Sequence, residues 1–469
     1  MGMKLLQRMF KKESLANYLK TDGAFKKTLG AKDLLGLGVG AVIGAGIFIL
    51  PGTVAATTAG PAVTLSFLLA AAVSALVAMA YSEVASTLPV AGSAYSYGNI
   101  IFGEVVGWIL GWALILEYFL AVAAVSTGWA AYFTSLVAPV FSLPKALSGP
   151  FNPAQGTYIN IIAVLIIVIV AALLSRGMKE SKYFQNAMVL LKIAIIILFI
   201  VVGAFYIKQS NYQPFIPARH AGAFGWQGVL TGTSLVFFAF LGFDALSSSA
   251  AEVKNPKRNM PLGIIGTLVI AGLLYSLVAL VLTGMVHYTK LNVADPVAYA
   301  LNAVGQRGIF LVVSLGALVG MFTMIYTMVY ASSRLVYAIG RDGLLPGNLG
   351  KLNVNGEPSR ALGVATVVIA TFGGLVPLER LVDLVNMGTL LAFFVVSLGV
   401  LPLRKRADLS NNGYHMPGYP ILPLVSAGLS LFMISQLHSE TLVVAAIWFG
   451  LGLVIYLAYG MKHSKLNMD

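Results

Sequence analysis

Long runs of mainly apolar residues constrain this chain more than any other feature of its sequence. Ile159–Leu174, Ile193–Ala204 and Leu262–Met285 are three of these runs. A helix that crosses a membrane needs about 20 mainly apolar residues, because it rises about 1.5 Å per residue through a core about 30 Å thick. Charged residues make up only 10% of the chain, against about 25% in soluble domains. The sequence therefore predicts an all-α integral membrane protein and excludes a chain of soluble domains.

Reading these runs between polar breaks predicts twelve transmembrane helices. The expected ranges are 34–57, 62–87, 104–137, 158–174, 184–207, 228–251, 260–286, 308–333, 361–376, 381–403, 421–437 and 441–461. Basic residues near the ends of spans stay in the cytoplasm. With the N-terminus inside, 23 of the 30 Lys and Arg residues fall on the cytoplasmic side. This bias favours cytoplasmic N- and C-termini and an even number of crossings.

The charge pattern and the absence of cysteine exclude several classes of function. The net charge of +13 follows the orientation of the spans, so it favours contact with anionic lipids over nucleic acid. Without Cys there is no disulfide, no thiolate nucleophile and no Cys-based metal site. The five His residues lie in loops or tails without ligand spacing. We therefore expect no metal, no cofactor and no enzyme activity.

Two spans contain residues that interrupt a helix near the middle of the membrane. The first reads Gly40-Ala-Val-Ile-Gly44-Ala-Gly46, and the sixth reads Phe237-Phe-Ala-Phe-Leu-Gly-Phe-Asp244. Interrupted backbone at this depth must face protein or a water-filled cavity, because lipid offers it no hydrogen bonds. Small residues at 36, 40 and 44 also fit close helix packing. Interruptions in the first and sixth spans, one in each half, favour a transporter with inverted repeats.

A broken helix exposes free backbone groups that suit a zwitterion. N–H groups at the start of the second half suit a carboxylate, and carbonyls at the end of the first half suit an ammonium group. A free α-amino acid carries both groups on adjacent atoms. The expected carboxylate ligands are the N–H groups of Ala45, Gly46 and Ile47, and the expected amine ligands are the carbonyls of Val42, Phe238 and Leu241. Ile43 lies between them in the predicted substrate site, and Met321 on the eighth span either lines the same pocket or packs in the core.

Three charged residues fall well inside predicted spans, where each is costly enough to be a functional candidate. Glu117 either titrates in proton coupling or balances a cationic substrate, or it is a protonated group bonded to a neighbouring helix. Lys192 lies about 13 Å into its span, where it either releases a proton or occupies a cation site, or snorkels to the interface. Asp244 either caps free N–H groups of the second half-helix or transfers protons.

The segment Pro89-Val-Ala-Gly92-Ser-Ala-Tyr95-Ser-Tyr97 resembles the signature between the second and third helices of the amino acid–polyamine–organocation (APC) superfamily. The two interrupted spans, the sixth continuing to Glu252-Val-Lys-Asn-Pro256, resemble those of its cationic amino acid transporter branch most closely. This resemblance covers essentially the whole chain. It implies a leucine-transporter-like 5+5 inverted repeat plus two C-terminal helices. The implied segments are a cytoplasmic amphipathic N-terminus (1–33), a first repeat (34–207), a second repeat (228–403), two added helices (421–461) and a cytoplasmic tail (462–469).

The resemblance also implies roles for individual residues. Family members bind the substrate carboxylate at positions that match Ala45 and Gly46, and the aromatic ring at Phe238 is similar to a gate over the substrate. Lys192 matches a lysine that replaces a sodium ion in proton-coupled relatives. The two further C-terminal helices of mammalian cationic transporters are absent here, so specificity is not expected to be exclusively cationic.

The sequence therefore predicts a secondary active transporter that imports L-amino acids by proton symport through alternating access. Expected substrates are small neutral amino acids, cationic ones, or both, such as alanine and arginine. An amino acid exchanger and a sodium-coupled symporter are the alternatives. A channel is disfavoured because it needs one continuous lined pore. The expected partners are the substrate and membrane lipids, without nucleic acid, in a bacterial inner (plasma) membrane; the sequence leaves oligomeric state and accessory subunits open.

Overall fold

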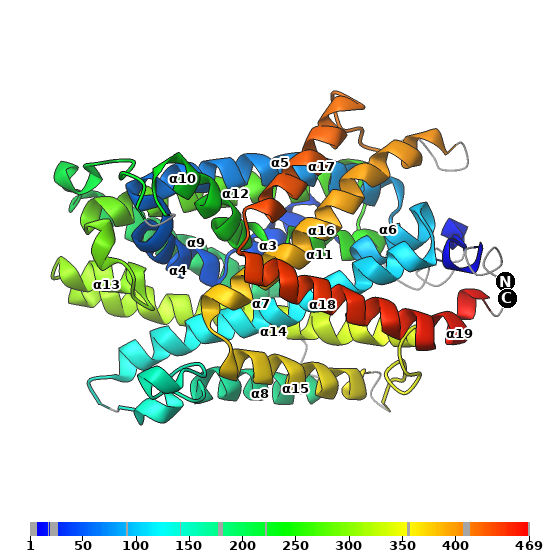
Figure 1. Cartoon of the computed structure of the whole chain (residues 1–469). Coiled ribbons are helices and arrows are strands. Elements are labelled where there is room, and N and C mark those ends of the chain that lie inside the picture. The colour runs from blue at the N-terminus through cyan, green and yellow to red at the C-terminus, as the bar shows by residue number, and fades with distance from the viewer. Residues whose placement is uncertain are drawn as a thin grey trace.

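The protein is an elongated bundle of helices (Figure 1). The computed structural model describes residues 7–16, 18, 27–90, 92–140, 142–176, 182–220, 223–353, 357–406 and 413–467. Across these residues, backbone pairing outside helices and turns is confined to isolated β-bridges. The predicted all-α fold class is therefore confirmed for the described chain.

Helices occupy every one of the twelve ranges predicted from the apolar runs. The α-helices are α3 (Ala31–Val42), α4 (Ala45–Val54), α5 (Val63–Thr87), α6 (Ser93–Ile101), α7 (Glu104–Val137), α8 (Ile161–Ser175), α9 (Lys182–Ala204), α10 (Gly225–Val236), α11 (Phe243–Ser248), α12 (Pro256–Met285), α13 (Pro296–Ala303), α14 (Arg307–Arg341), α15 (Ser359–Leu375), α16 (Leu378–Lys405), α17 (Ile421–Ser435), α18 (Ser439–Ile455) and α19 (Met461–His463). The 3₁₀ and π segments are η1 (Ala55–Ala59), η2 (Gly60–Ala62), η3 (Lys145–Leu147), η4 (Pro153–Gln155), η5 (Gln209–Tyr212), η6 (Phe237–Phe240), η7 (Ala250–Glu252), η8 (Tyr288–Lys290), η9 (Tyr456–Gly460) and η10 (Lys465–Asn467).

Several of these helices are long and apolar enough to cross a membrane. Among the described residues, 8 helical stretches meet that requirement, and three shorter apolar helices, α8, α15 and α17, accompany them. The longest stretch, Ala45–Thr87, has its regular helix broken at Gly60, whose φ of +65° is a positive value that glycine accepts more readily than other residues. The chain is thus a multi-pass membrane protein.

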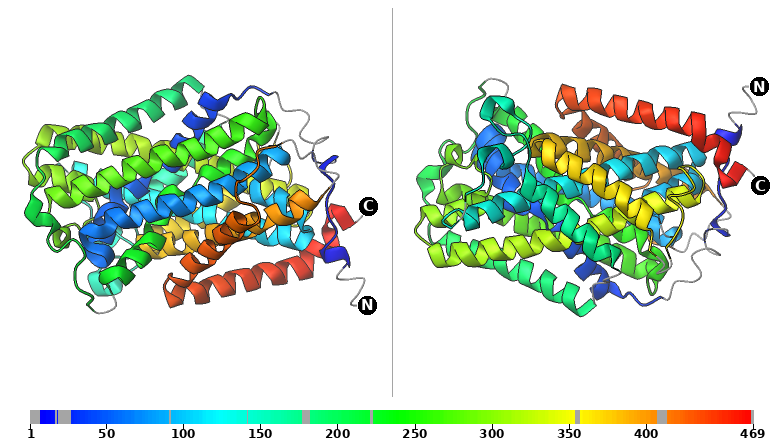
Figure 2. Two further views of the ribbon diagram at one scale, coloured as in Figure 1. Left: turned by 90° about the horizontal axis from the view of Figure 1, so that it is seen from above. Right: turned by 90° about the horizontal axis from the view of Figure 1, so that it is seen from below.

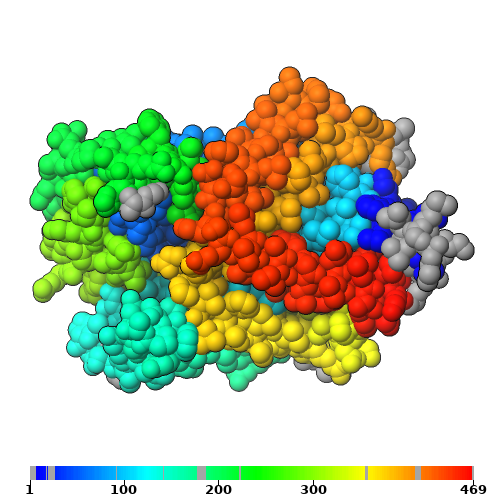
Figure 3. Space-filling view, viewed as in Figure 1, coloured from blue at the N-terminus to red at the C-terminus, as the bar shows by residue number. Residues whose placement is uncertain are grey.

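Helix α7 lies at the centre of the bundle and α18 at its edge. In the most apolar window of α7, 89% of the residues are buried, against 22% for the last span, Ser439–His463. Both views in Figure 2 place α18 on the outside, and Figure 3 shows α17 and α18 forming part of the molecular surface. An apolar helix with so much exposed side-chain surface is suited to contact with lipid.

Two of the helix boundaries that differ from the predicted ranges lie where charged residues find partners. Helix α3 begins at Ala31 rather than 34, since Asp33 Oδ2 accepts the Gly30 N–H at 2.9 Å and caps the helix. Helix α14 continues to Arg341 rather than ending at 333. Arg334 is bound there by Glu357 at 3.1 Å, and its guanidinium lies 5.0 Å from the Tyr330 ring centroid. A charged side chain that is paired in this way does not have to end a helix.

The predicted N-terminal segment 1–33 lies partly outside the described residues, as does the end of the predicted tail 462–469. The part near residue 11 binds the junction between α6 and α7. The Glu13 N–H donates to Asn99 O at 3.2 Å, and the Glu104 N–H donates to Lys11 O at 3.1 Å. The N-terminal segment is thereby attached to one end of the bundle.

Candidate functional site

The first predicted helix interruption is present between α3 and α4. Helix α3 ends at Val42 and α4 begins at Ala45. Ile43 is extended (φ −78°, ψ 99°), and the N-cap Gly44 has φ −135° and ψ −141°. A glycine N-cap has no side chain to accept the first N–H groups of α4. The predicted carboxylate ligands therefore start a helix without a capping side chain.

The second predicted interruption is present between α10 and α11. The chain changes from α10 to the 3₁₀ segment η6 at Phe237, extends at Leu241 (φ −67°, ψ 155°) and reverses at Gly242 (φ +101°). A Cβ atom at Gly242 would lie 3.0 Å from the Ala41 carbonyl oxygen. Glycine is required here both by the positive φ and by the close approach of the first broken helix.

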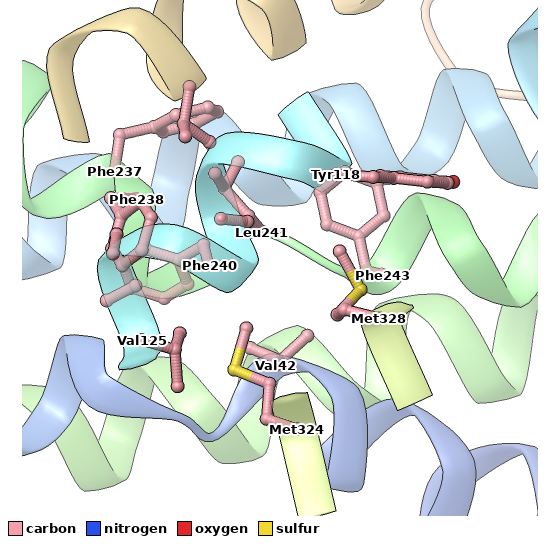
Figure 4. Packing of buried hydrophobic residues seen from close by; sticks show 14 of the residues in the cluster. Val42, Tyr118, Val125, Phe237, Phe238, Phe240, Leu241, Phe243, Met324 and Met328 are labelled. Carbon is pink, nitrogen blue, oxygen red and sulfur yellow. The ribbon is translucent and has the colours of Figure 1, made fainter. Parts of the chain in front are cut away.

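The structure brings the two interruptions into direct contact. A Cβ atom at Gly46 would lie 2.6 Å from Ala239 Cα. Figure 4 draws Phe238 and Leu241, from η6 and the turn after it, on one side of this junction and Val42 and Met324 on the other. The residues predicted to bind the amine are therefore neighbours in space, although nearly 200 residues separate them in the chain.

Lys192 reaches from α9 into the first interruption. Its side chain is buried, with 1% of the residue exposed. Nζ donates to Gly40 O at 3.0 Å and to Ile43 O at 3.2 Å. Its aliphatic stem packs on Gly320 of α14, where a Cβ would lie 3.2 Å from Lys192 Cγ. The ammonium group thus donates hydrogen bonds to carbonyls that the broken helix leaves without intrahelical partners.

Two of the predicted carbonyl ligands already accept hydrogen bonds within the protein. Tyr275 of α12 donates its hydroxyl to Val42 O at 2.9 Å, and the Leu241 N–H donates to Phe238 O at 3.3 Å. Each oxygen retains a second lone pair for a ligand. Sequence reasoning missed Tyr275, since a tyrosine in an apolar span gives no signal of which helix its hydroxyl faces.

Methionines of α14 pack against the start of α4. A Cβ at Gly44 would lie 1.9 Å from Met324 Sδ, and a Cβ at Gly128 of α7 would lie 3.6 Å from Met321 Sδ and 3.2 Å from Ala45 Cβ. Met321, singled out from the sequence, is fully buried beside the first turn of α4. Met324, three residues later on the same helix, was missed because nothing in the local pattern separates it from other core methionines.

Glu117 and Asp244 form a buried acidic pair at the second interruption. Both are fully buried and interact electrostatically with each other. The Tyr118 hydroxyl donates to Asp244 Oδ2 at 3.3 Å. The side chain of Thr389 in α16 is a hydrogen-bonding partner for Glu117, and Asp244 Oδ1 has no hydrogen-bond partner within the described residues. Asp244 occupies the first turn of α11, the position from which a cap was predicted, and that capping role stays a prediction.

The described residues contain no group of three or more His, Cys, Asp or Glu side chains placed to hold a metal ion. The candidate site therefore consists of two broken helices with one lysine, two methionines, an aromatic ring at Phe238 and an acidic pair nearby. Paired half-helices with free backbone groups near mid-membrane are typical of secondary transporters. The fold and the site together define a multi-pass membrane transporter.

Comparison with known proteins gives the family. A profile described as "Amino acid permease" matches residues 29–458. The methylthioribose transporter of Bacillus subtilis (strain 168) is 46% identical over 443 residues, covering 94% of this chain and 95% of that protein. The branched-chain amino acid permease BcaP of Lactococcus lactis subsp. cremoris (strain MG1363) is 44% identical, covering 96% of this chain and 97% of its own length. The vacuolar cationic amino acid transporter 4 of Arabidopsis thaliana is 36% identical, covering 82% of this chain and 65% of its own. The chain belongs to the amino acid permease family of the APC superfamily.

Proposed function

We propose that this protein imports L-amino acids across a bacterial plasma membrane by proton symport. The observation that carries the proposal is the contact between the two broken helices. Uncapped N–H groups at the start of α4 and carbonyls at Val42, Phe238 and Leu241 meet where Gly46 touches Ala239. An α-carboxylate at the N–H groups and an α-ammonium at the carbonyls satisfy both sets of groups with one small ligand.

The position of Lys192 supports coupling to protons. Its ammonium group donates to Gly40 O and Ile43 O, which are oxygen ligands of the kind that a sodium ion would need. A built-in cation there leaves sodium without a role and provides a group that can lose and regain a proton. A sodium-coupled symporter is the alternative that this contact disfavours.

The surroundings of the site favour neutral substrates, with cationic ones as the open alternative. Met321 and Met324 lie beside the first turn of α4, and Figure 4 draws Phe238 across the junction from Met324. Thioether and aromatic groups suit small or branched apolar side chains, and two relatives are named as branched-chain permeases. A cationic substrate would need the carboxylate of Glu117 within reach of its side chain.

Alternating access in this proposal follows from a 5+5 inverted repeat spanning 34–207 and 228–403, with twelve crossings in all. Substrate must bind outward-facing and inward-facing states differently for transport to be driven. The two half-helices that each repeat contributes provide the contacts that can change between states, and the Phe238 ring would close over bound substrate.

Uptake into proteoliposomes tests the proposal. Radiolabelled alanine, leucine and arginine are supplied with an inward proton gradient, with or without sodium, to liposomes that contain buffer alone or unlabelled amino acid. Proton symport predicts concentrative uptake of at least one of them without sodium or preloading. Uptake only after preloading would replace symport with exchange, and a sodium requirement would overturn the role of Lys192.

A further inference from the structure

The first half of the broken sixth helix, α10, ends beside a buried asparagine of α16. Asn386 is fully buried, and its Nδ2 donates to Ser234 O at 2.7 Å and, more weakly, to Leu235 O at 3.5 Å. Ser234 and Leu235 belong to the last turn of α10, immediately before the chain narrows into η6. The last carbonyls of a helix lack regular partners, and Asn386 supplies a donor to two of them.

The orientation of the Asn386 amide follows from this environment. Two carbonyl oxygens facing the side chain require its NH₂ end, since the oxygen end would meet two other acceptors. Asn386 Oδ1 has no partner within the described residues. The protein therefore buries an amide at this position although only its donor end is used, which costs free energy and needs a compensating role.

A second residue on the same face of α16 contacts both sides of the interruption. Phe393 lies seven residues, or two turns, after Asn386. Its ring centroid is 5.8 Å from Phe237, at the start of η6, and 5.0 Å from Phe243, at the start of α11. One face of α16 thus holds the end of α10 through a directional hydrogen bond and flanks the whole break with an aromatic ring.

We propose that Asn386 is a positioning residue for the substrate site: it fixes the last turn of α10 so that the ring and carbonyl of Phe238 face the first broken helix. The inference rests on the proposed amino acid transport for its kinetic readout. Phe238 follows Ser234 by four residues, and the tight 3₁₀ turn between them restricts how far the backbone can shift at one residue without moving the other. A shift of the Ser234 carbonyl therefore moves Phe238.

The same helix offers a matched control for loss of a buried hydrogen bond. The hydroxyl of Ser397 in α16 is 2.9 Å from the hydroxyl of Ser426 in α17, and both residues are fully buried. Ser397→Ala removes a buried hydrogen bond of α16 about three turns along the helix from Asn386 and one turn beyond Phe393. A merely structural role for Asn386 predicts that the two positions behave alike.

The kinetic experiment measures KM and kcat for alanine and leucine uptake by proteoliposomes. Asn386→Leu keeps the branched heavy-atom skeleton, with larger methyl groups, and removes the donor, so we expect KM to rise about fivefold or more for both substrates. Asn386→Gln retains the amide and should recover part of that loss. Ser397→Ala should leave KM within twofold of the wild-type value. Unchanged KM in Asn386→Leu, or an equal rise in Ser397→Ala, would overturn the proposal.

A second measurement does not depend on the substrate. The chain contains no Cys, so Leu241→Cys places a single thiol at the interruption. In this background Asn386→Leu should change the rate of thiol labelling by more than about threefold, while Ser397→Ala should leave it unaltered. Equal rates in all three proteins would overturn the positioning role. If the wild-type protein takes up no amino acid but Asn386→Leu still changes the labelling rate, the proposed function is rejected and the positioning role of Asn386 stands.

Discussion

Glycine at position 46 is required by a neighbour and not by its own backbone angle. It lies in the first turn of α4, and the atoms closest to its missing side chain are Cα, Cβ and N of Ala239. These belong to backbone or to a methyl group that cannot rotate away. Residues of two half-helices can approach so closely only where one of them is glycine.

Gly46→Ala should therefore separate α4 from η6 and lower transport by at least about tenfold, because a contact of 2.6 Å to Ala239 Cα must be relieved by moving backbone at the substrate site. Uptake into proteoliposomes measures the loss. Gly363→Ala is the control, since a Cβ at Gly363 meets nothing within 4 Å and alanine favours a helix interior by about 1 kcal/mol. Equal activity of both variants would contradict the proposed contact.

The second prediction at the residue scale concerns Lys192. Lys192→Ala removes the donor from Gly40 O and Ile43 O, so gradient-driven accumulation should fall to the level of protein-free liposomes while substrate binding remains measurable by thermal stabilisation. Leaving buried carbonyls without a donor costs about 1–3 kcal/mol each, so the melting temperature should also fall.

Lys208→Ala provides the matched control, because Lys208 is an exposed lysine beyond the far end of α9. Its accumulation should equal that of the wild type. Normal accumulation in Lys192→Ala would remove this lysine from the coupling mechanism and leave it a structural role at the break.

Single residues also show the limits of sequence reasoning. The interior position of Lys192 follows from counting residues along the span, and its burial is as expected. Its acceptor carbonyls depend on which helices lie next to α9, which one sequence does not specify. Tyr275, Met324 and Asn386 were missed for the same reason: each lies in an otherwise regular apolar helix, and only the packing reveals what it touches.

At the scale of elements, the breaks were the most predictable feature and the docking of the last helices the least. Glycine, proline and aspartate inside apolar spans located both interruptions. By contrast, α18 docks on α7 through Trp108, Trp112 and Trp448. The Trp112 and Trp448 rings stack with centroids 4.7 Å apart, and their indole N–H groups donate to each other's carbonyls at 2.9 and 3.3 Å. Tryptophans spread over 340 residues carry no pairing signal.

Trp108→Leu should weaken the packing of α18 against α7. The Trp108 ring is fully buried, stacks on Trp112 and Tyr456, and donates Nε1–H to Gly452 O at 2.9 Å. Removing a buried aromatic ring and one hydrogen bond should cost about 3 kcal/mol, seen as a lower melting temperature in detergent. Trp226→Leu, at a residue that is 66% exposed, should leave the melting temperature unchanged. A similar drop in melting temperature in both variants would reject a specific role of Trp108 in the contact between α7 and α18.

At the scale of the whole molecule, the described N- and C-terminal segments meet at one end of the bundle (Figure 1). Lys11 Nζ donates to Leu466 O, and the Lys465 N–H donates to Asp342 O at 3.1 Å. Tyr95 donates to Asp342 Oδ2 at 2.8 Å, and burial raises the pKa of that carboxyl group. Arg404 binds both oxygens of Glu83 at 2.5 and 2.8 Å. This end, expected in the cytoplasm, is closed by polar contacts between distant segments.

Adjacent termini agree with an even number of crossings, and the cysteine-free chain allows the orientation to be tested residue by residue. Val140, 92% exposed in the loop after α7, is expected outside, and the exposed Lys351, after α14, is expected inside. In intact cells a membrane-impermeant maleimide should label Val140→Cys but not Lys351→Cys, and permeabilised cells should label both. Five predicted crossings separate the two positions, so labelling of both from the same side would show that one span between them is wrong. Labelling of Lys351→Cys alone would show that the whole molecule has the opposite orientation in the membrane.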